Sequence, residues 1–145
     1  MAVYICKEAA DTIRLGQLIG EKLTGGDVLC LEGPLGSGKT TFAKGIARAL
    51  GIKEQITSPT FTIVSSYPGS PELFHVDLYR IDRIEQLEDI GIEEILYGNG
   101  IVVIEWGEKM VSLLPEATIL INITIKENNC REIKINGFKK DIKYD

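Results

Sequence analysis

The 145-residue sequence has few cysteines, and their spacing supports neither a metal site nor a disulfide framework. Cys6, Cys30 and Cys130 lie far apart, and no pair has the short separation of zinc ligands. Cys6 and Cys30 fall within apolar runs, so we expect both to be small residues of the core. The lack of a disulfide pattern is typical of a reducing compartment, and the location we expect is the cytoplasm.

Long hydrophobic runs and an excess of positive charge are also missing. No apolar run approaches the roughly 18 residues that a membrane-spanning helix requires, and the first residues lack the form of a signal peptide. The formal net charge is −5, which argues against a broad surface for nucleic acid but leaves room for a local basic patch. We therefore expect no membrane association and, at most, a local contact with nucleic acid.

The length and composition favour one globular domain over residues 1–145. The expected strands cover residues 2–6, 28–31, 61–66, 73–78, 101–105, 118–125 and 131–135; the expected helices cover 9–23, 40–50 and, broken near Gly91, 82–96. Strands alternate with helices in the first half, which predicts an α/β fold whose mostly parallel sheet has helices on both faces. Two expected hairpins add antiparallel strands, so the sheet should be mixed.

Residues 33–40 read GPLGSGKT, which matches the phosphate-binding pattern G-x-x-x-x-G-K-[ST] of a P-loop. The stretch follows an apolar run and opens a helical pattern. Its glycines allow backbone N–H groups to approach phosphate oxygens, and the helix N-terminus adds further N–H groups. Lys39 would place its charge at the β and γ phosphates, Thr40 would ligate Mg²⁺, and Thr41 would donate to the α phosphate. The alternative is a glycine-rich turn with a surface lysine.

Two carboxylates end apolar runs elsewhere in the chain: Asp77 in LFHVDLYR and Glu105 in IVVIEW. If both strands run parallel to the strand before the P-loop, the three sites meet at the carboxyl edge of the sheet. A P-loop protein needs groups there that hold the metal and orient water. The alternatives are an ordinary salt bridge between Asp77 and Arg80, and a helix-capping role for Glu105. A metal-holding strand usually ends in Asp, so the division of roles between the two acids stays open.

Three further features each have two interpretations. His75, the only histidine, is more often a packed residue than a catalyst. Trp106 follows Glu105 directly and is either a core residue or an exposed contact for a partner. The segment TSPT at 57–60 is either a turn or a loop whose hydroxyls reach the γ phosphate. The guanine-reading patterns N-K-x-D and T-K-x-D are absent from the sequence, which favours ATP over GTP.

The motifs GPLGSGKTT, TSPTF, HVDLYR, EDIGIEE and IEW, in this order and at these spacings, resemble the TsaE (YjeE) family of small bacterial P-loop ATPases. The resemblance implies a three-layer α/β/α P-loop NTPase fold with a mixed, mostly parallel sheet of about seven strands. It implies a role in forming threonylcarbamoyladenosine at position 37 of tRNAs that read ANN codons. Family members bind ATP or ADP with Mg²⁺, hydrolyse ATP slowly when alone, and associate with TsaD and TsaB. Any contact with tRNA would be indirect or local.

The same resemblance implies a set of nucleotide-binding residues: Thr12, Gly33, Gly36, Ser37, Gly38, Lys39, Thr40, Thr41, Ser58, Thr60 and Arg131. Within this set, Ser58 and Thr60 would belong to a switch-like loop near the γ phosphate. Thr12 and Arg131 would frame the base and the ribose.

The catalytic residues implied by the resemblance are Lys39, Asp77 and Glu105, with Mg²⁺ held by Thr40 and Glu105. Asp77 would orient water or the water shell of the metal. One departure from the family pattern is Pro34, which stands where many members have Asp and so removes a negative charge beside the phosphates. Two other functions compete with this one: a self-sufficient small-molecule kinase and a non-catalytic, nucleotide-gated adaptor.

Overall fold

The computed structural model describes residues 1–56 and 63–144 of the chain. In chain order the elements are β1 (Ala2–Cys6), α1 (Ala9–Gly20), β2 (Val28–Glu32), α2 (Lys39–Ala49), β3 (Val64–Tyr67), β4 (Leu73–Asp77), α3 (Glu85–Asp89), α4 (Ile92–Leu96), β5 (Ile101–Glu105), the 3-10 segment η1 (Gly107–Leu113), β6 (Ile119–Ile125), the 3-10 turn η2 (Glu127–Asn129) and β7 (Arg131–Asn136). The predicted α/β class is confirmed.

The strands form one seven-stranded sheet in the order β1-β7-β6-β2-β5-β4-β3. The central strands β6, β2, β5 and β4 pair in parallel. Strands β7 and β3 run in the opposite direction, through the antiparallel pairs β6–β7, β1–β7 and β3–β4. The sheet is therefore mixed, with most strands pointing the same way, as predicted.

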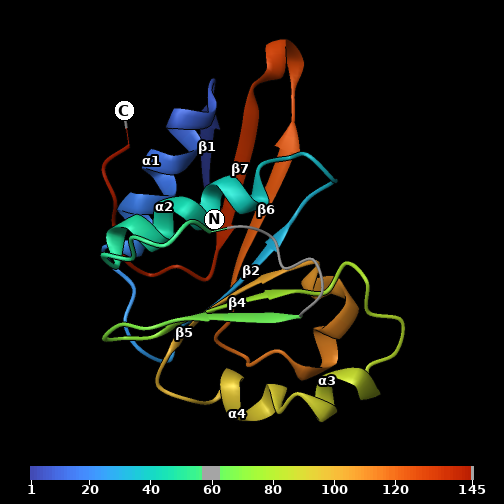
Figure 1. Cartoon of the computed structure of the whole chain (residues 1–145). Helices are drawn as coiled ribbons and strands as arrows, with labels where there is room; N and C mark the ends of the chain where they lie inside the picture. The colour runs from blue at the N-terminus through green and yellow to red at the C-terminus, as the bar shows by residue number, and fades with distance from the viewer. Residues whose placement is uncertain (57–62, 145) are drawn as a thin grey trace.

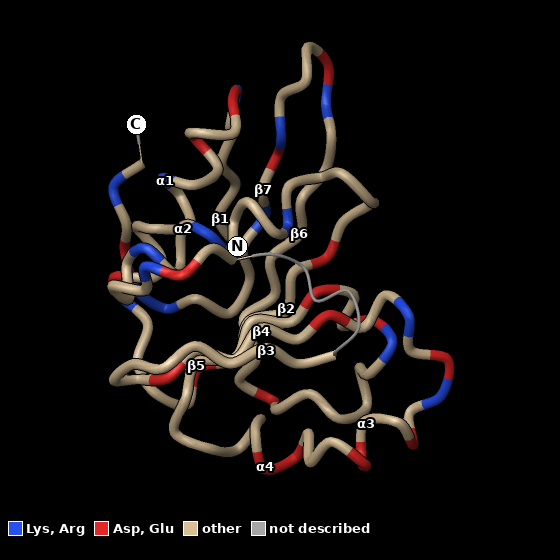
Figure 2. Tube along the Cα trace, in the orientation of Figure 1, with Lys and Arg blue, Asp and Glu red and all other residues tan. Residues whose placement is uncertain are grey.

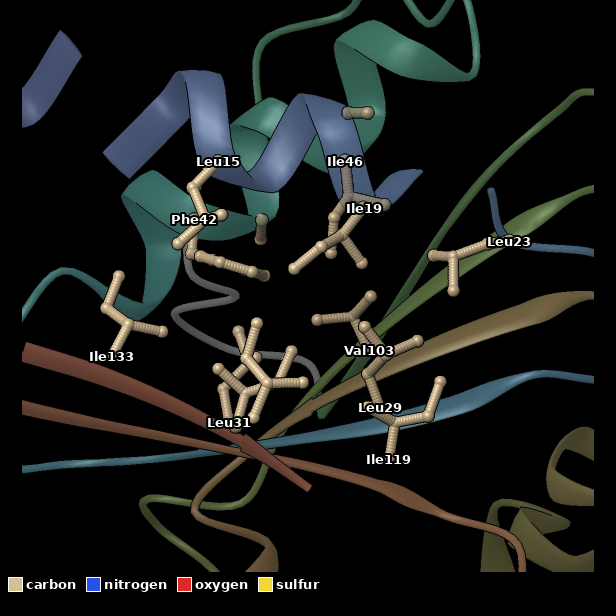
Figure 3. Close-up of a cluster of buried hydrophobic side chains, with 14 of the residues drawn as sticks. Leu15, Ile19, Leu23, Leu29, Leu31, Phe42, Ile46, Val103, Ile119 and Ile133 are labelled. Carbon is tan, nitrogen blue, oxygen red and sulfur yellow. The ribbon is translucent and has the colours of Figure 1, made fainter. Parts of the chain in front are cut away.

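Two hydrophobic clusters pack on opposite faces of this sheet. Helices α1 and α2 cover one face, whereas α3 and α4 lie on the other side of the molecule, near β4 and β5 (Figure 1). In the first cluster, side chains of α1 and α2 meet those of the strands (Figure 3); examples are Leu15, Ile19, Phe42, Ile46, Leu29, Leu31, Val103 and Ile133. The second cluster includes Val102, Ile104, Leu87, Ile92 and Met110. Because β5 contributes to both clusters, all of its residues are buried, and its sequence is apolar up to its last residue.

Helices α1 and α2 approach so closely that their backbones touch. A Cβ atom added to Gly16 would overlap the carbonyl oxygen of Phe42, and one added to Gly45 would overlap the carbonyl oxygen of Ile13. Glycine is needed at both places because any side chain would push the helices apart. The contact fixes α2, which carries the P-loop lysine, against the first helix of the chain.

Several predicted boundaries are corrected by the structure. Helix α1 ends at Gly20, not at residue 23, although Leu23 is still buried. The predicted helix over 82–96 begins only at Glu85, and its break falls at Gly91, whose φ of 71° is in the left-handed region. Strand β3 covers Val64–Tyr67, while residues 61 and 62 of the predicted strand lie outside the described residues. Segment η1 was not predicted because it has no helical periodicity.

The cysteines behave as small core residues where that was predicted. Cys6 and Cys30 are fully buried and unpaired. Burial raises the pKa of the Cys30 thiol to about 12, so this thiol stays protonated near neutral pH. In the part of the chain that the structure describes, no helix has the length and apolar character needed to cross a bilayer.

Candidate functional site

The P-loop connects the end of β2 to the start of α2 and turns through two glycines. Gly36 (φ 79°) and Gly38 (φ 109°) are both in the region that favours glycine, and Gly38 is the cap residue of α2. Ser37 between them is fully buried, and its hydroxyl has no hydrogen-bond partner among the described residues. The loop thus has the sharp turn at a helix N-terminus that a phosphate site requires.

Lys39 lies at the base of this loop with little exposure to solvent. Its side chain is 5% exposed, and its Nζ donates to the carbonyl oxygen of Gly33 at 2.6 Å. The same Nζ lies 3.3 Å from the centroid of the Trp106 ring. Burial lowers the pKa of Lys39, and nearby carboxylates, Glu105 first among them, oppose that shift. The ammonium is therefore held between a carbonyl and an aromatic face.

The predicted meeting of three strand ends at one edge of the sheet is confirmed. Strands β2, β5 and β4 run parallel, with Glu105 in register with Leu31 on one side and with Asp77 on the other. The two acids therefore end adjacent strands beside the P-loop. Thr40, at the start of α2, donates its hydroxyl to Glu105 Oε2 at 3.0 Å.

Glu105 is buried and accepts two side-chain hydrogen bonds on one oxygen. It is 3% exposed, and Oε2 lies 2.6 Å from His75 Nε2 as well as 3.0 Å from the Thr40 hydroxyl. No side-chain cap hydrogen bond is made at the N-terminus of α2. The Glu105 carboxylate contacts Thr40 in the first turn of α2, so it lies at the N-terminus of that helix, and the helix-capping alternative stays open beside the metal-site prediction.

Asp77 has a different environment from Glu105. Its Oδ1 accepts the backbone N–H of Tyr79 at 3.0 Å, and the side chain is only half-buried. Among the described residues, no ion pair joins Asp77 to Arg80. The more exposed acid is thus available to groups that enter the site, whereas the buried acid is already engaged by protein donors.

Trp106 is neither a core residue nor a fully exposed one. Its φ of 63° lies in the left-handed region, which is unusual for a bulky side chain. The indole packs edge-on against the Tyr79 ring, with centroids 5.1 Å apart, and its face meets Lys39. No pattern in the sequence predicts this aromatic contact with the P-loop lysine.

A cavity of about 330 Å³ adjoins the P-loop on the side of α1. Its lining includes Thr12, Gly36, Ser37, Gly38, Thr41 and Arg131. Arg131 donates from Nε to the Ser37 carbonyl at 2.9 Å and from Nη2 to the Gly36 carbonyl at 3.3 Å. Residues far apart in the sequence are thereby brought to the loop. Ser58 and Thr60 lie outside the described residues.

The oxygen atoms of Glu105, at the end of β5, and of Thr40, at the start of α2, fit a magnesium ion better than a zinc ion. Mg²⁺ in nucleotide sites binds through one or two protein oxygens together with phosphates and water. The Thr40 hydroxyl and the Glu105 carboxylate supply such a pair, already in contact with one another. In the described part of the chain there is no cluster of three or more His, Cys, Asp or Glu residues that could hold a metal by themselves.

Comparisons with known proteins agree on one family. The family model for "Threonylcarbamoyl adenosine biosynthesis protein TsaE" matches residues 6–133. The chain is 46% identical over 131 residues to the tRNA threonylcarbamoyladenosine biosynthesis protein TsaE of Treponema pallidum, covering 90% of this chain and 97% of that one. It is 43% identical to the TsaE protein of a Nostoc species, covering 95% and 87%. The crystal structure of Bacillus subtilis YdiB superposes with a TM-score of 0.81 at 33% identity, covering 92% and 83%.

Proposed function

Because this chain belongs to the TsaE family, we propose that it is the ATP-hydrolysing subunit of threonylcarbamoyladenosine biosynthesis. The modified nucleoside is the one at position 37 of tRNAs that read ANN codons, and the chain acts on a complex of TsaD and TsaB. The observation that carries the proposal is the meeting of the P-loop, Asp77 and the Thr40–Glu105 pair at one edge of the sheet.

The nucleotide, ATP or ADP, lies along the N-terminus of α2 in this proposal. Backbone N–H groups of the loop from Gly33 to Thr41 surround the phosphates. The base and the ribose occupy the cavity beside α1, where Thr12 and Arg131 border the loop. Arg131 also stiffens the loop, because it holds two of its carbonyl groups.

Four side chains perform the chemistry at the phosphates. Lys39 exchanges its contact with the Gly33 carbonyl for the β and γ phosphates, and brings a positive charge out of a partly desolvated position. Thr40 and Glu105 hold Mg²⁺, which when bound neutralises charge that develops on the phosphates. Asp77, the more exposed acid, orients the attacking water.

The chain does not itself transfer the threonylcarbamoyl group in this proposal. TsaD and TsaB carry out that transfer, and ATP turnover by this chain resets their complex between catalytic cycles. Hydrolysis by the chain alone is slow, and contact with tRNA is indirect or local, in keeping with the net charge of −5. The chain works in the cytoplasm, where its partners and tRNA are found.

The P-loop assignment is tested by comparing Lys39→Ala with Lys44→Ala, which removes a lysine from the same helix outside the loop. Lys39→Ala should weaken nucleotide binding and lower the rate of ATP hydrolysis by on the order of 10² to 10³, because a preorganised charge at the phosphates is lost. Lys44→Ala should leave both near the wild-type values. Binding is measured by calorimetric titration with ADP and hydrolysis by phosphate release; unchanged turnover in Lys39→Ala would remove the assignment.

A further inference from the structure

His75 lies in the middle of β4, buried against the carboxylate at the end of β5. It is 1% exposed, and its Nε2 is 2.6 Å from Glu105 Oε2. Asp77 and Glu105 are direct register partners, and His75 precedes Asp77 by two residues. Side chains two residues apart on a strand share a face. The His75 side chain on β4 therefore reaches the Glu105 side chain diagonally, on the adjacent parallel strand β5.

The hydrogen-bonding groups around the ring determine the direction of this bond. An ionised carboxylate has only acceptors, so the proton between His75 and Glu105 belongs to Nε2. The other ring nitrogen, Nδ1, is buried and has no hydrogen-bond partner among the described residues. Within the described part of the chain, the side-chain hydrogen bond of the His75 ring is therefore the one between Nε2 and Glu105.

Glu105 is the middle member of a short chain of three side chains. Oε2 accepts from the His75 ring on one side and from the Thr40 hydroxyl on the other. A glutamate has one more rotatable bond than the aspartate usual at such a strand end, so its carboxylate is harder to hold in one place. The bond from His75 removes that freedom and leaves the carboxylate facing the first turn of α2.

We propose that His75 is a positioning residue: by donating its Nε2 proton it holds the Glu105 carboxylate in place against the Thr40 hydroxyl. This inference rests on the proposed function, because the use of that arrangement is to bind Mg²⁺ together with nucleotide. His75 touches neither the nucleotide nor the metal. It acts only through the orientation of Glu105, as buried donors behind metal-site groups commonly do.

The test compares His75→Gln, which keeps an N–H donor at similar reach, with His75→Leu, which removes it. ADP affinity is measured by calorimetry with Mg²⁺ and again in EDTA. In His75→Leu the gain in ADP affinity that Mg²⁺ provides should fall roughly 10- to 100-fold. ADP affinity in EDTA should not change, and His75→Gln should restore most of the gain.

The outcomes separate this inference from the proposed function. Equal losses in the Leu and Gln variants, or equal losses with and without Mg²⁺, would overturn the positioning role, because they would indicate general damage to the fold. Wild-type protein that binds ADP equally well with and without Mg²⁺ would overturn the proposed metal site and the inference together. Thermal unfolding of each variant establishes that the proteins compared are folded.

A second measurement uses the wild-type protein and so does not depend on a variant that folds. The sequence contains one histidine, so ¹⁵N-histidine labelling gives a single imidazole in an NMR spectrum. Long-range ¹H–¹⁵N correlations distinguish a protonated ring nitrogen from an unprotonated one. We expect Nε2, which faces Glu105, to carry a proton; an Nε2 without a proton would overturn the donor role.

Discussion

Lys39 and Trp106 form a contact that neither residue's position in the sequence predicts. The Lys39 ammonium lies 3.3 Å from the indole centroid, and both residues are at least half-buried. Such cation–π contacts contribute about 0.5–2 kcal/mol, more when desolvated. In the absence of nucleotide the aromatic face thus helps to stabilise a charge that burial alone would disfavour.

This contact can be measured by a double-mutant cycle on the nucleotide-free protein. Trp106→Leu and Lys39→Met, singly and together, should show a coupling of about 0.5–2 kcal/mol in the free energy of unfolding. The sign should be such that the second mutation costs less once the first is present. Denaturant unfolding provides the free energies; single-mutant effects that add with no coupling would mean that the ring does not stabilise the charge.

The positions of the candidate site residues were predictable to the extent that motifs and strand ends mark them. The P-loop pattern located Lys39 and Thr40, and the apolar runs located Asp77 and Glu105. The bond from His75 to Glu105 depends on the register of two strands that are 30 residues apart, and local periodicity does not specify register. The sequence also could not separate the environments of Asp77 and Glu105, because their difference in burial depends on the tertiary fold.

At the level of elements, the P-loop helix is held by its contact with α1. Gly45 of α2 faces Ile13 and Gly16 of α1 at backbone distance. Thr12, on the same helix α1, is buried beside the loop and lines the cavity there. The helix pair therefore connects the packing of the fold to the geometry of the candidate nucleotide site.

Gly45→Ala should destabilise the protein by about 1–3 kcal/mol, because the added methyl group overlaps the Ile13 carbonyl. This cost outweighs the gain of about 1 kcal/mol that alanine brings to a helix interior. Arg48→Ala, on the exposed side of α2, is the control and should change stability by no more than about 0.5 kcal/mol. Chemical denaturation measures both. A Gly45→Ala protein as stable as wild type would contradict the close packing of the two helices.

Element boundaries were less predictable than element types. The helical pattern of apolar residues continues to Leu23, but the helix ends at Gly20, and Leu23 is buried in the segment that follows the helix. Segment η1 is held by contacts of the folded chain: Met110 packs in the cluster beneath β5, and Lys109 donates to the Tyr79 and Ile81 carbonyls. Tertiary contacts of this kind leave no periodic signal in the sequence.

For the whole molecule, the order of strands was the part that the sequence could not supply. Alternating strands and helices predicted a mixed, mostly parallel sheet, but not that β2 would lie between β5 and β6. That central place matters because it puts the P-loop directly beside the strand end that carries Glu105. The carboxyl edge of the parallel strands is where ligands bind in open α/β sheets.

Charge is distributed unevenly over the molecule. Acidic residues dominate α3 and α4, whereas many lysines and arginines lie near α1, α2 and the C-terminal segment (Figure 2). The acidic members include Glu85, Glu88, Glu93 and Glu94 in the first turns of these helices. The acidic face of α3 and α4 disfavours direct contact with a phosphate-rich partner.

The most direct test of the proposed function is the amount of threonylcarbamoyladenosine formed per TsaD in a reconstituted system. The system contains TsaD, TsaB, tRNA, the threonylcarbamoyl donor and ATP, with this chain present, absent, or carrying Lys39→Ala. We predict that only the intact chain raises the product above a single turnover of TsaD. The same amount of product in all three reactions would contradict the proposal that ATP turnover at this P-loop drives the modification.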